Sequence, residues 1–240
     1  MRIGGLEKLT LIDYPGHLAA IIFTQGCNFR CHFCYNPQLV WPKRESDEEK
    51  KDKGYLGWSQ GDLFLFLEER KGRLDGVVIT GGEPTLHLDL PEFIRKIKSM
   101  GYDVKLDSNG TNPEMLEYLI KEGLVDYIAM DIKAPLEKYE QVVGAKLDLP
   151  RLEKSVKMIM ESGLPYEFRS TLVPQLLNQE DIEAMGQLIA GARAWYLQAF
   201  KSDTELVDDS FRNKQAFSSA QMEELAAIGR KYVPTCQVRG

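Results

Sequence analysis

Short apolar runs alternate with longer amphipathic stretches along most of this 240-residue chain. Such an alternation is typical of repeated βα units, in which parallel strands form a sheet that helices cover. The apolar runs predict strands over residues 19–24, 76–80, 103–107, 127–131, 166–171 and 195–200, with a further strand around Cys236. The amphipathic stretches predict helices over residues 61–71, 91–100, 113–121, 151–162, 180–190 and 219–232. The sequence therefore predicts an α/β fold with six βα units.

Six units are too few for the usual closed barrel of eight strands. We therefore expect a partial, laterally open (β/α)6 barrel, and the alternative is a doubly wound open sheet. We expect a single domain over residues 1–240, with a charged, apolar-poor loop inserted at about 42–57. The simplest interpretation of that loop is a solvated surface segment, and a lid or a docking element for a partner is the alternative.

Charge and hydropathy limit the classes of partner. The net charge of −6 gives no footprint for nucleic acid or for an anionic membrane. No secretory signal is visible after Met1, and no apolar run approaches the length of a membrane span. The four cysteines do not suit a disulfide framework in a chain of this length. We therefore expect a cytoplasmic protein whose thiols stay reduced or bind a metal.

Three of the cysteines, Cys27, Cys31 and Cys34, follow the first predicted strand within eight residues. An iron-sulfur cubane takes one thiolate per iron, so three nearby cysteines suit a cluster with one open iron. A structural zinc site prefers four protein ligands and would need His17, His32 or Cys236 as the fourth. The spacing favours the open cluster, with zinc and unligated core thiols as alternatives.

Unusual polar residues follow the other predicted strands as well. In parallel βα folds the carboxyl ends of the strands meet at one rim, where ligands bind. The residues predicted at this rim are Gly81, Gly82, Glu83, Asp107, Ser108, Asn109, Asp131, Lys133, Arg169 and Lys201. The glycines would let backbone groups approach a small polar ligand, with the glutamate as a nearby acceptor.

Each of these features also has a purely structural interpretation. The glycine pair could form a tight strand-to-helix turn. Asp107 and Asn109 could be turn formers that bond the local backbone, and Asp131 and Lys133 share one face of a strand, so they could form an ion pair. Lys201 is the weakest of the set. We interpret His17 and His87 as loop or capping residues, and Cys236 as a buried apolar thiol.

Two motifs in this order resemble a known family. The spacing Cys27-x3-Cys31-x2-Cys34 with aromatic Phe33, followed by the run 81–84 of sequence GGEP, is similar to the radical S-adenosylmethionine (SAM) superfamily. Within it, the runs 13–16 (DYPG), 23–31 (FTQGCNFRC) and 35–37 (YNP) resemble the glycyl-radical enzyme activases, most of all those of anaerobic ribonucleoside-triphosphate reductase. The resemblance covers nearly the whole chain and weakens over 42–53 and after Lys201.

The resemblance implies a fold, cofactors and site residues. The fold would be a partial barrel of the radical SAM type, and the three cysteines would hold one 4Fe-4S cluster whose open iron binds the methionine moiety of S-adenosylmethionine. The residues implied around this cofactor are Gly81, Gly82 and Glu83 at the amino group, Asp107 and Ser108 at the cofactor or a monovalent cation, Asp131, Lys133 and Arg169 completing the cradle, and Phe33 facing the adenine. Lys201 departs from the residue usual in pyruvate formate-lyase activases.

The resemblance also implies an activity. Such an enzyme cleaves S-adenosylmethionine reductively, with flavodoxin or ferredoxin as electron donor, and installs a glycyl radical on a partner enzyme. The alternatives are activation of another glycyl-radical enzyme such as pyruvate formate-lyase, or a small-molecule or RNA substrate. From other classes, a zinc-stabilised binding module remains open, as does an electron-transfer protein in which Cys236 closes the cluster.

Overall fold

The computed structural model describes residues 1–41 and 58–239, so the charged loop expected at about 42–57 lies outside the described residues. Contacts divide the chain into two compact units. Unit 1 comprises Met1–Asn28, Gln38–Ser108 and Glu114–Ile128, and unit 2 comprises Phe29–Pro37, Asn109–Pro113 and Ala129–Gly240. The expectation of one domain stays a prediction.

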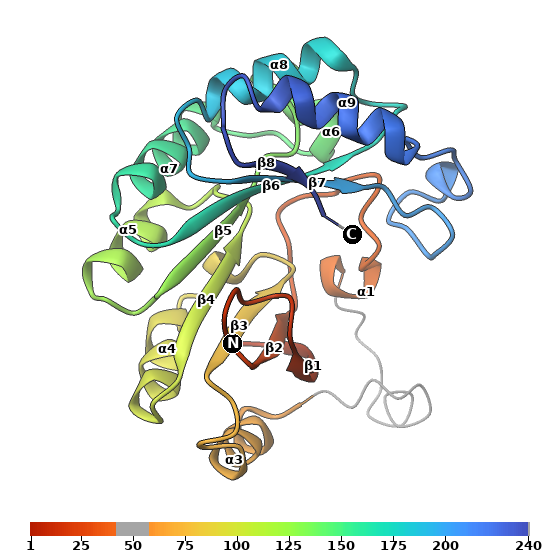
Figure 1. Ribbon diagram of the computed structural model, residues 1–240. Coiled ribbons are helices and arrows are strands. Elements are labelled where there is room, and N and C mark those ends of the chain that lie inside the picture. Colours follow the sequence, from red (N-terminus) through yellow and green to blue (C-terminus); the bar gives the residue numbers. More distant parts are fainter. Residues whose placement is uncertain (42–57, 240) are drawn as a thin grey trace. The chain divides into compact units, whose positions relative to one another are not determined.

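Unit 1 contains four strands that are neighbours in the order β1-β2-β3-β4 (Figure 1). The strands are β1 (Ile3–Thr10), β2 (Ala19–Thr24), β3 (Gly76–Gly81) and β4 (Asp103–Ser108). β1 is antiparallel to β2, whereas β2, β3 and β4 run parallel to one another. The helices around this sheet are α1 (Pro37–Val40), α3 (Gln60–Glu69), α4 (Leu90–Ser99) and α5 (Pro113–Lys121).

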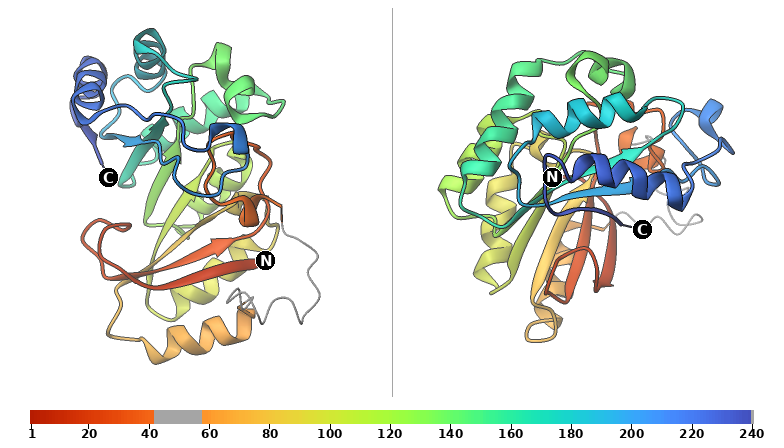
Figure 2. Two further views of the ribbon diagram at one scale, coloured as in Figure 1. Left: turned by 90° about the vertical axis from the view of Figure 1, so that its right-hand side faces the viewer. Right: turned by 45° about the horizontal axis from the view of Figure 1, so that its top comes forward.

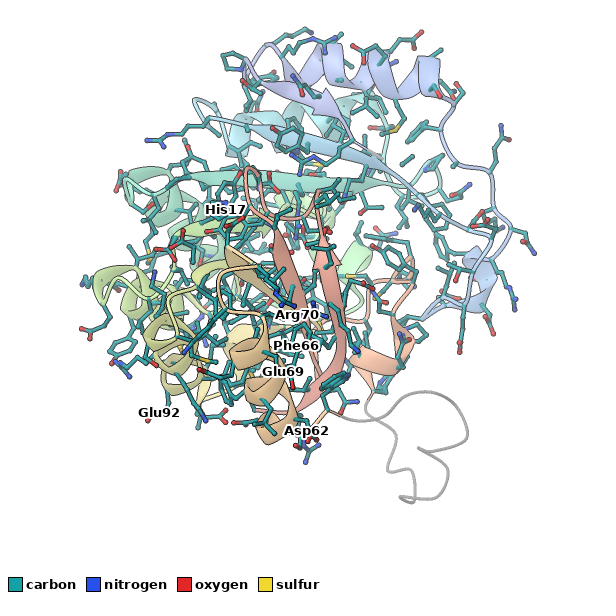
Figure 3. The ribbon with its side chains drawn as sticks, turned by 60° about the horizontal axis from the view of Figure 1, so that its bottom comes forward. His17, Asp62, Phe66, Glu69, Arg70 and Glu92 are labelled. Carbon is teal, nitrogen blue, oxygen red and sulfur yellow. The ribbon has the colours of Figure 1, made fainter. Side chains whose placement is uncertain are left out.

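Local sequence explains why these elements form. β2 and β3 are apolar runs that are buried along most of their length, as expected for inner strands of a parallel sheet. α4 buries Phe93, Ile94 and Ile97, which recur on one face at helical spacing. Ser59 begins α3, because its side chain accepts a hydrogen bond from the backbone N–H of Asp62. At the end of α3, the guanidinium of Arg70 lies over the ring of Phe66 (Figure 3).

Unit 2 contains the parallel strands β6 (Tyr166–Leu172), β7 (Trp195–Ala199) and β8 (Cys236–Val238). β5 (Tyr127–Asp131) begins in unit 1 and ends in unit 2. The helices are α6 (Tyr139–Val143), α7 (Leu149–Glu161), α8 (Gln179–Leu188) and α9 (Ser219–Gly229). α8 and α9 lie side by side (Figure 2), and each begins at a capping box, formed by Asn178 and Ser218 respectively.

The predicted strands and helices are confirmed, with boundaries that differ by at most three residues. The sequence did not predict β1, whose two glycines and charged residues give a weak strand signal. It also did not predict the short helices α1 and α6, or the 3₁₀ turns Pro84–Leu86, Leu136–Lys138 and Asp209–Phe211. Among the described residues, none of the helices has both the length and the apolar character that crossing a bilayer requires.

Candidate active site

The first predicted cysteine follows the carboxyl end of β2. Backbone hydrogen bonds fix the two residues between the strand and Cys27, because Gln25 N donates to Arg2 O at 3.1 Å and Gly26 N donates to Leu39 O at 2.7 Å. Cys27 is partly exposed. In unit 1 this places a thiol at the strand end where ligands of parallel βα folds bind.

The other two cysteines lie in unit 2, on a turn in which Cys34 N donates to Cys31 O at 3.0 Å. Cys31 is buried and Cys34 is partly exposed. The start of this segment is held by Arg30 N, which donates to Val143 O at 2.7 Å, and by the ring of Phe29, whose centroid lies 6.3 Å from that of Tyr139. The end of α6 therefore supports the turn that carries both thiols.

His32, between these two cysteines, fastens the turn to a distant segment. Its Nδ1 lies 2.9 Å from Asp208 Oδ2, its Nε2 lies 3.2 Å from Gln141 O, and its ring stacks on Phe211 with centroids 5.4 Å apart. Two backbone bonds run in parallel, from Val207 N to Cys34 O at 2.9 Å and from Asp208 N to His32 O at 3.2 Å. Both ring nitrogens are engaged, so His32 is not placed as a metal ligand.

The donor set suits an iron-sulfur cluster by its chemistry. All four cysteines are thiols. Among the described residues no three His, Cys, Asp or Glu side chains are grouped so that they could bind a metal ion, so the structure does not bring the three motif thiols together. Cys236 is fully buried beneath α9, where it packs against Gly229, and burial raises the pKa of its thiol to about 12. The interpretation of Cys236 as a buried apolar thiol is confirmed. The assignment of Cys27, Cys31 and Cys34 as cluster ligands stays a prediction.

The glycine pair at the end of β3 packs against the segment that leads to Cys27. Gly82 N donates to Thr24 O at 2.9 Å, and Glu83 N donates to Gly26 O at 2.8 Å. A Cβ atom on Gly81 would lie 2.4 Å from Thr24 N, and one on Gly82 would lie 2.1 Å from Gly26 O. Gly81 also has a φ of +114°. The missing side chains are thus required for the backbone contact between this turn and the cysteine segment.

Glu83 is almost fully buried, and its Oε1 atom accepts hydrogen bonds from three donors. Thr85 donates twice, from its backbone N at 3.1 Å and from its Oγ1 at 2.5 Å, and Ser108 Oγ donates at 2.9 Å. Three donors on one oxygen suit the ionised carboxylate, which can only accept. In unit 1 the structure therefore brings together two predicted site residues, Glu83 and Ser108, at the ends of β3 and β4.

Asp107, the next predicted residue on β4, forms a buried ion pair. Lys105 Nζ donates to Asp107 Oδ1 at 2.6 Å, and the two side chains are only 1% and 9% exposed. The residues are two positions apart on one strand, so both side chains point to the same face of the sheet. Lys105 was not among the predicted site residues, although this spacing could have identified it.

In unit 2, the structure brings together Asp131, Lys133 and Arg169 at the ends of β5 and β6. Asp131 accepts from Lys133 Nζ at 3.0 Å and from Arg169 Nε at 3.1 Å. Burial by itself raises the pKa of the Asp131 carboxyl, but the charges of Arg169 and Lys133 outweigh it and hold the pKa at about 2. Burial likewise opposes the charge of Lys133, and Asp131 with Cys31 holds the pKa of that ammonium above its usual range.

Phe33 and Tyr139 border this network. The ammonium of Lys133 lies 5.9 Å from the centroid of the Phe33 ring, and Lys133 N donates to Tyr139 Oη at 3.2 Å. Tyr139 Oη in turn donates to Asp131 O at 3.3 Å, and burial raises the pKa of its phenol beyond the ordinary range. Phe33 therefore lies beside the cationic group of unit 2. Tyr139 was not predicted, because no local motif marks it.

The remaining polar candidates lie elsewhere. His17 lies in the loop after β1, where its ring stacks on Tyr14 and its Nε2 lies 3.2 Å from Asp103 Oδ2, which confirms it as a loop residue (Figure 3). His87 closes a 3₁₀ turn and lines a cavity of about 440 Å³ beside Gly26, and its Nε2 has no hydrogen-bond partner among the described residues. Lys201 is exposed after β7.

Comparison with known proteins identifies the family. The sequence profile described as "Radical SAM superfamily" matches residues 21–189. The chain belongs to the radical SAM superfamily. A protein of Methanocaldococcus jannaschii, provisionally named as a glycyl-radical enzyme activating enzyme, is 31% identical over 99% of this chain and 95% of its own length. The pyruvate formate-lyase-activating enzyme of Listeria monocytogenes is 27% identical over 78% of this chain and 75% of its own length. These relatives make this radical SAM protein an enzyme of the activase group.

Solved structures agree on the fold. Streptococcus suis SuiB bound to S-adenosylmethionine superimposes with a TM-score of 0.67 at 15% identity, over 92% of this chain and 50% of SuiB, so the chain spans about half the length of that protein. A domain of a pyruvate-formate lyase-activating enzyme from Bacteroides vulgatus superimposes with a TM-score of 0.55 at 16% identity, over 69% of this chain and 99% of that domain. The fold is α/β with an open sheet, as the predicted partial barrel requires. Membership of this superfamily implies a 4Fe-4S cluster and S-adenosylmethionine as cofactors.

Proposed function

We propose that this chain is a radical SAM activating enzyme that installs a glycyl radical on anaerobic ribonucleoside-triphosphate reductase. The observation that carries the proposal is the contact between the two superfamily motifs in unit 1, where Glu83 N donates to Gly26 O, one residue before Cys27, at 2.8 Å. The segment that leads to Cys27 and the run 81–84 thus meet at the carboxyl ends of β2 and β3, where this class of fold binds ligands. The 31% identity to a protein provisionally named as a glycyl-radical enzyme activating enzyme supports the activase part of the proposal. The choice of the reductase as partner rests on the sequence resemblance of the runs 13–16, 23–31 and 35–37.

In the proposed enzyme, Cys27, Cys31 and Cys34 hold one 4Fe-4S cluster. When bound, the cluster supplies one electron from flavodoxin or ferredoxin to the sulfonium of S-adenosylmethionine, which releases methionine and a 5'-deoxyadenosyl radical. With the cofactors bound, the overall reaction would move a hydrogen atom from the α-carbon of a glycine in the partner enzyme to the 5' carbon of the deoxyadenosyl group, which would leave a glycyl radical and 5'-deoxyadenosine. The thiols require a reducing compartment, and a cytoplasmic location is part of the proposal.

The protein's own residues bind and orient the cofactor. The buried carboxylate of Glu83 suits a cationic amino group, and Thr85 and Ser108 fix its orientation through their hydrogen bonds. In unit 2 the two cations Lys133 and Arg169 exceed the one anion Asp131, so this group suits a carboxylate or an electron-rich oxygen. Phe33 offers an aromatic face next to Lys133 for the adenine.

Anaerobic reconstitution with iron and sulfide tests the proposal. With dithionite and S-adenosylmethionine, the protein should release 5'-deoxyadenosine and methionine, whereas Cys31→Ala should release neither. Addition of anaerobic ribonucleoside-triphosphate reductase should produce a glycyl-radical doublet in the electron paramagnetic resonance spectrum. A doublet with pyruvate formate-lyase instead would transfer the proposal to that partner. Fully loaded protein without 5'-deoxyadenosine, or one zinc per chain without sulfide, would refute it.

A further inference from the structure

The ion pair between Lys105 and Asp107 lies on the face of the unit 1 strands that carries a buried apolar cluster. In the parallel register, Lys105 lies opposite Val78, and Val78 lies opposite Ile21. Val78 and Ile21 belong to a buried cluster with Tyr14, against which Tyr127 packs. The ammonium of Lys105 lies 5.7 Å from the centroid of the Tyr127 ring. A full positive charge is thus held beside an apolar cluster, where contact with a carboxylate stabilises it.

The location of this charge bears on the cation that the sequence resemblance implies beside Asp107. A monovalent cation would be held there by the negative charge of the carboxylate. Oδ1 of Asp107 already accepts from Lys105 Nζ at 2.6 Å, so the pair has no net charge. A second cation at the same carboxylate would lie within a few ångströms of the ammonium, in surroundings of low dielectric constant, and would be repelled. The residues present therefore do not suit a bound monovalent cation.

We infer that Lys105 supplies the positive charge at Asp107 from within the strand, so that cofactor binding in this protein does not require a monovalent cation. Lys105 is a positioning residue in this scheme, because it acts on the carboxylate and not on the reacting atoms. The link to S-adenosylmethionine rests on the proposed function. The inference that the Lys105 ammonium takes the place of an exchangeable cation does not depend on the proposed function, because it follows from the contact between Lys105 and Asp107.

Thermal melting of the full chain without cofactors tests the ion replacement directly. Wild-type protein should melt at the same temperature in potassium chloride, sodium chloride and choline chloride at equal ionic strength, because choline is too large to enter a buried site. Lys105→Met should melt at a lower temperature in choline chloride, and potassium or sodium should raise this temperature in a saturable manner, as a ligand of the folded state does. The double variant Lys105→Met/Asp107→Asn should lose this preference for small cations.

The matched control is Lys121→Met, which removes a lysine from an ion pair with Glu117 in which the lysine side chain is 71% exposed. It should show no preference for any of the three salts. A saturable effect of potassium or sodium on the wild type would overturn the inference, and so would a folded Lys105→Met protein with equal melting temperatures in all three salts. If Lys105→Met does not fold in any salt, the wild-type measurement decides alone.

Binding of S-adenosylmethionine to the reconstituted protein separates this inference from the proposed function. Wild-type affinity should agree within about twofold between potassium chloride and choline chloride, whereas Lys105→Met should bind about tenfold more weakly in choline chloride. Absence of S-adenosylmethionine binding by the wild type in every salt would contradict the proposed function. The melting temperatures in the three salts would then still test whether Lys105 takes the place of the cation. A wild-type affinity that falls about tenfold in choline chloride would overturn the inference.

Discussion

Replacement of Asp131 by Asn tests the ion-pair network of unit 2 quantitatively. The charges of Arg169 and Lys133 outweigh the effect of burial and lower the pKa of the Asp131 carboxyl from 3.8 to about 2. One pKa unit corresponds to about 1.4 kcal/mol, so the ionised carboxylate contributes about 2.4 kcal/mol to the free energy of unfolding. Asp131→Asn should lose at least this amount at neutral pH, because the substitution also leaves two partly buried cations without the carboxylate.

The same pKa values fix the pH dependence of this loss. A carboxyl whose pKa is lower in the folded than in the unfolded state stabilises the protein above its unfolded pKa, and the contribution disappears as the pH falls through the folded pKa. The difference in unfolding free energy between wild type and Asp131→Asn should therefore stay constant above about pH 5. At about pH 3 the part due to ionisation should fall to about 1.3 kcal/mol.

Urea unfolding of the cofactor-free chain, followed by tryptophan fluorescence and circular dichroism between about pH 3 and pH 7, measures this difference. Glu140→Gln is the matched control, because Glu140 also pairs with a lysine, but the side chain of that lysine, Lys146, is 94% exposed, so solvent screening removes most of the effect. A difference between wild type and Asp131→Asn that does not change from neutral pH to about pH 3 would refute the assignment of a paired, ionised carboxylate.

Two further predictions concern the cysteine segment. Gly82→Ala should displace the backbone at Gly26, whose O atom would lie 2.1 Å from the new Cβ, and should lower both the iron loading and, by about 3 kcal/mol, the unfolding free energy. The control is Gly61→Ala in α3, whose Cβ meets only Ser59 Oγ at 3.5 Å, and this substitution should lower neither quantity. Iron and sulfide analysis with urea unfolding measures both effects, and normal loading of Gly82→Ala would contradict the packing argument. Cys236→Ser should retain full iron and sulfide, and loss of the cluster in this variant would show that Cys236 is a ligand.

Much of the fold could be predicted because its strands are buried on both faces. A strand such as β2 must be apolar throughout, so its sequence alone marks it. β1 could not be predicted in this way, because it is the edge strand of unit 1 and its residues Glu7, Lys8 and Leu9 are exposed. Its formation depends on pairing with β2, which is a tertiary interaction and leaves no periodic signal in the chain.

For the candidate site as well, local sequence motifs could be predicted and contacts between distant residues could not. Cys27, Gly82 and Glu83 could be identified because each motif is local in sequence. The contacts that hold these motifs in place could not be identified, because they join residues that are distant in the chain. His32, between Cys31 and Cys34, contacts Asp208 across 176 residues, and Ser108 donates to Glu83 across 25. Thr85 is the exception, since a hydroxyl residue two positions after a glutamate that begins a 3₁₀ turn is a local capping signal.

Lys105 shows why the ionic character of a site requires the structure. The alternation of a strand places Lys105 and Asp107 on one face, but the sequence could not show whether that face is in water, where the pair would contribute little, or in an apolar layer, where it must stay intact. The low exposure of both side chains shows that the pair is buried, so it must be counted among the charges of the candidate site. In unit 1 the buried pair is neutral, so the carboxylate of Glu83 is the anion that a cationic group would meet. In unit 2 the group of Asp131, Lys133 and Arg169 keeps one net positive charge.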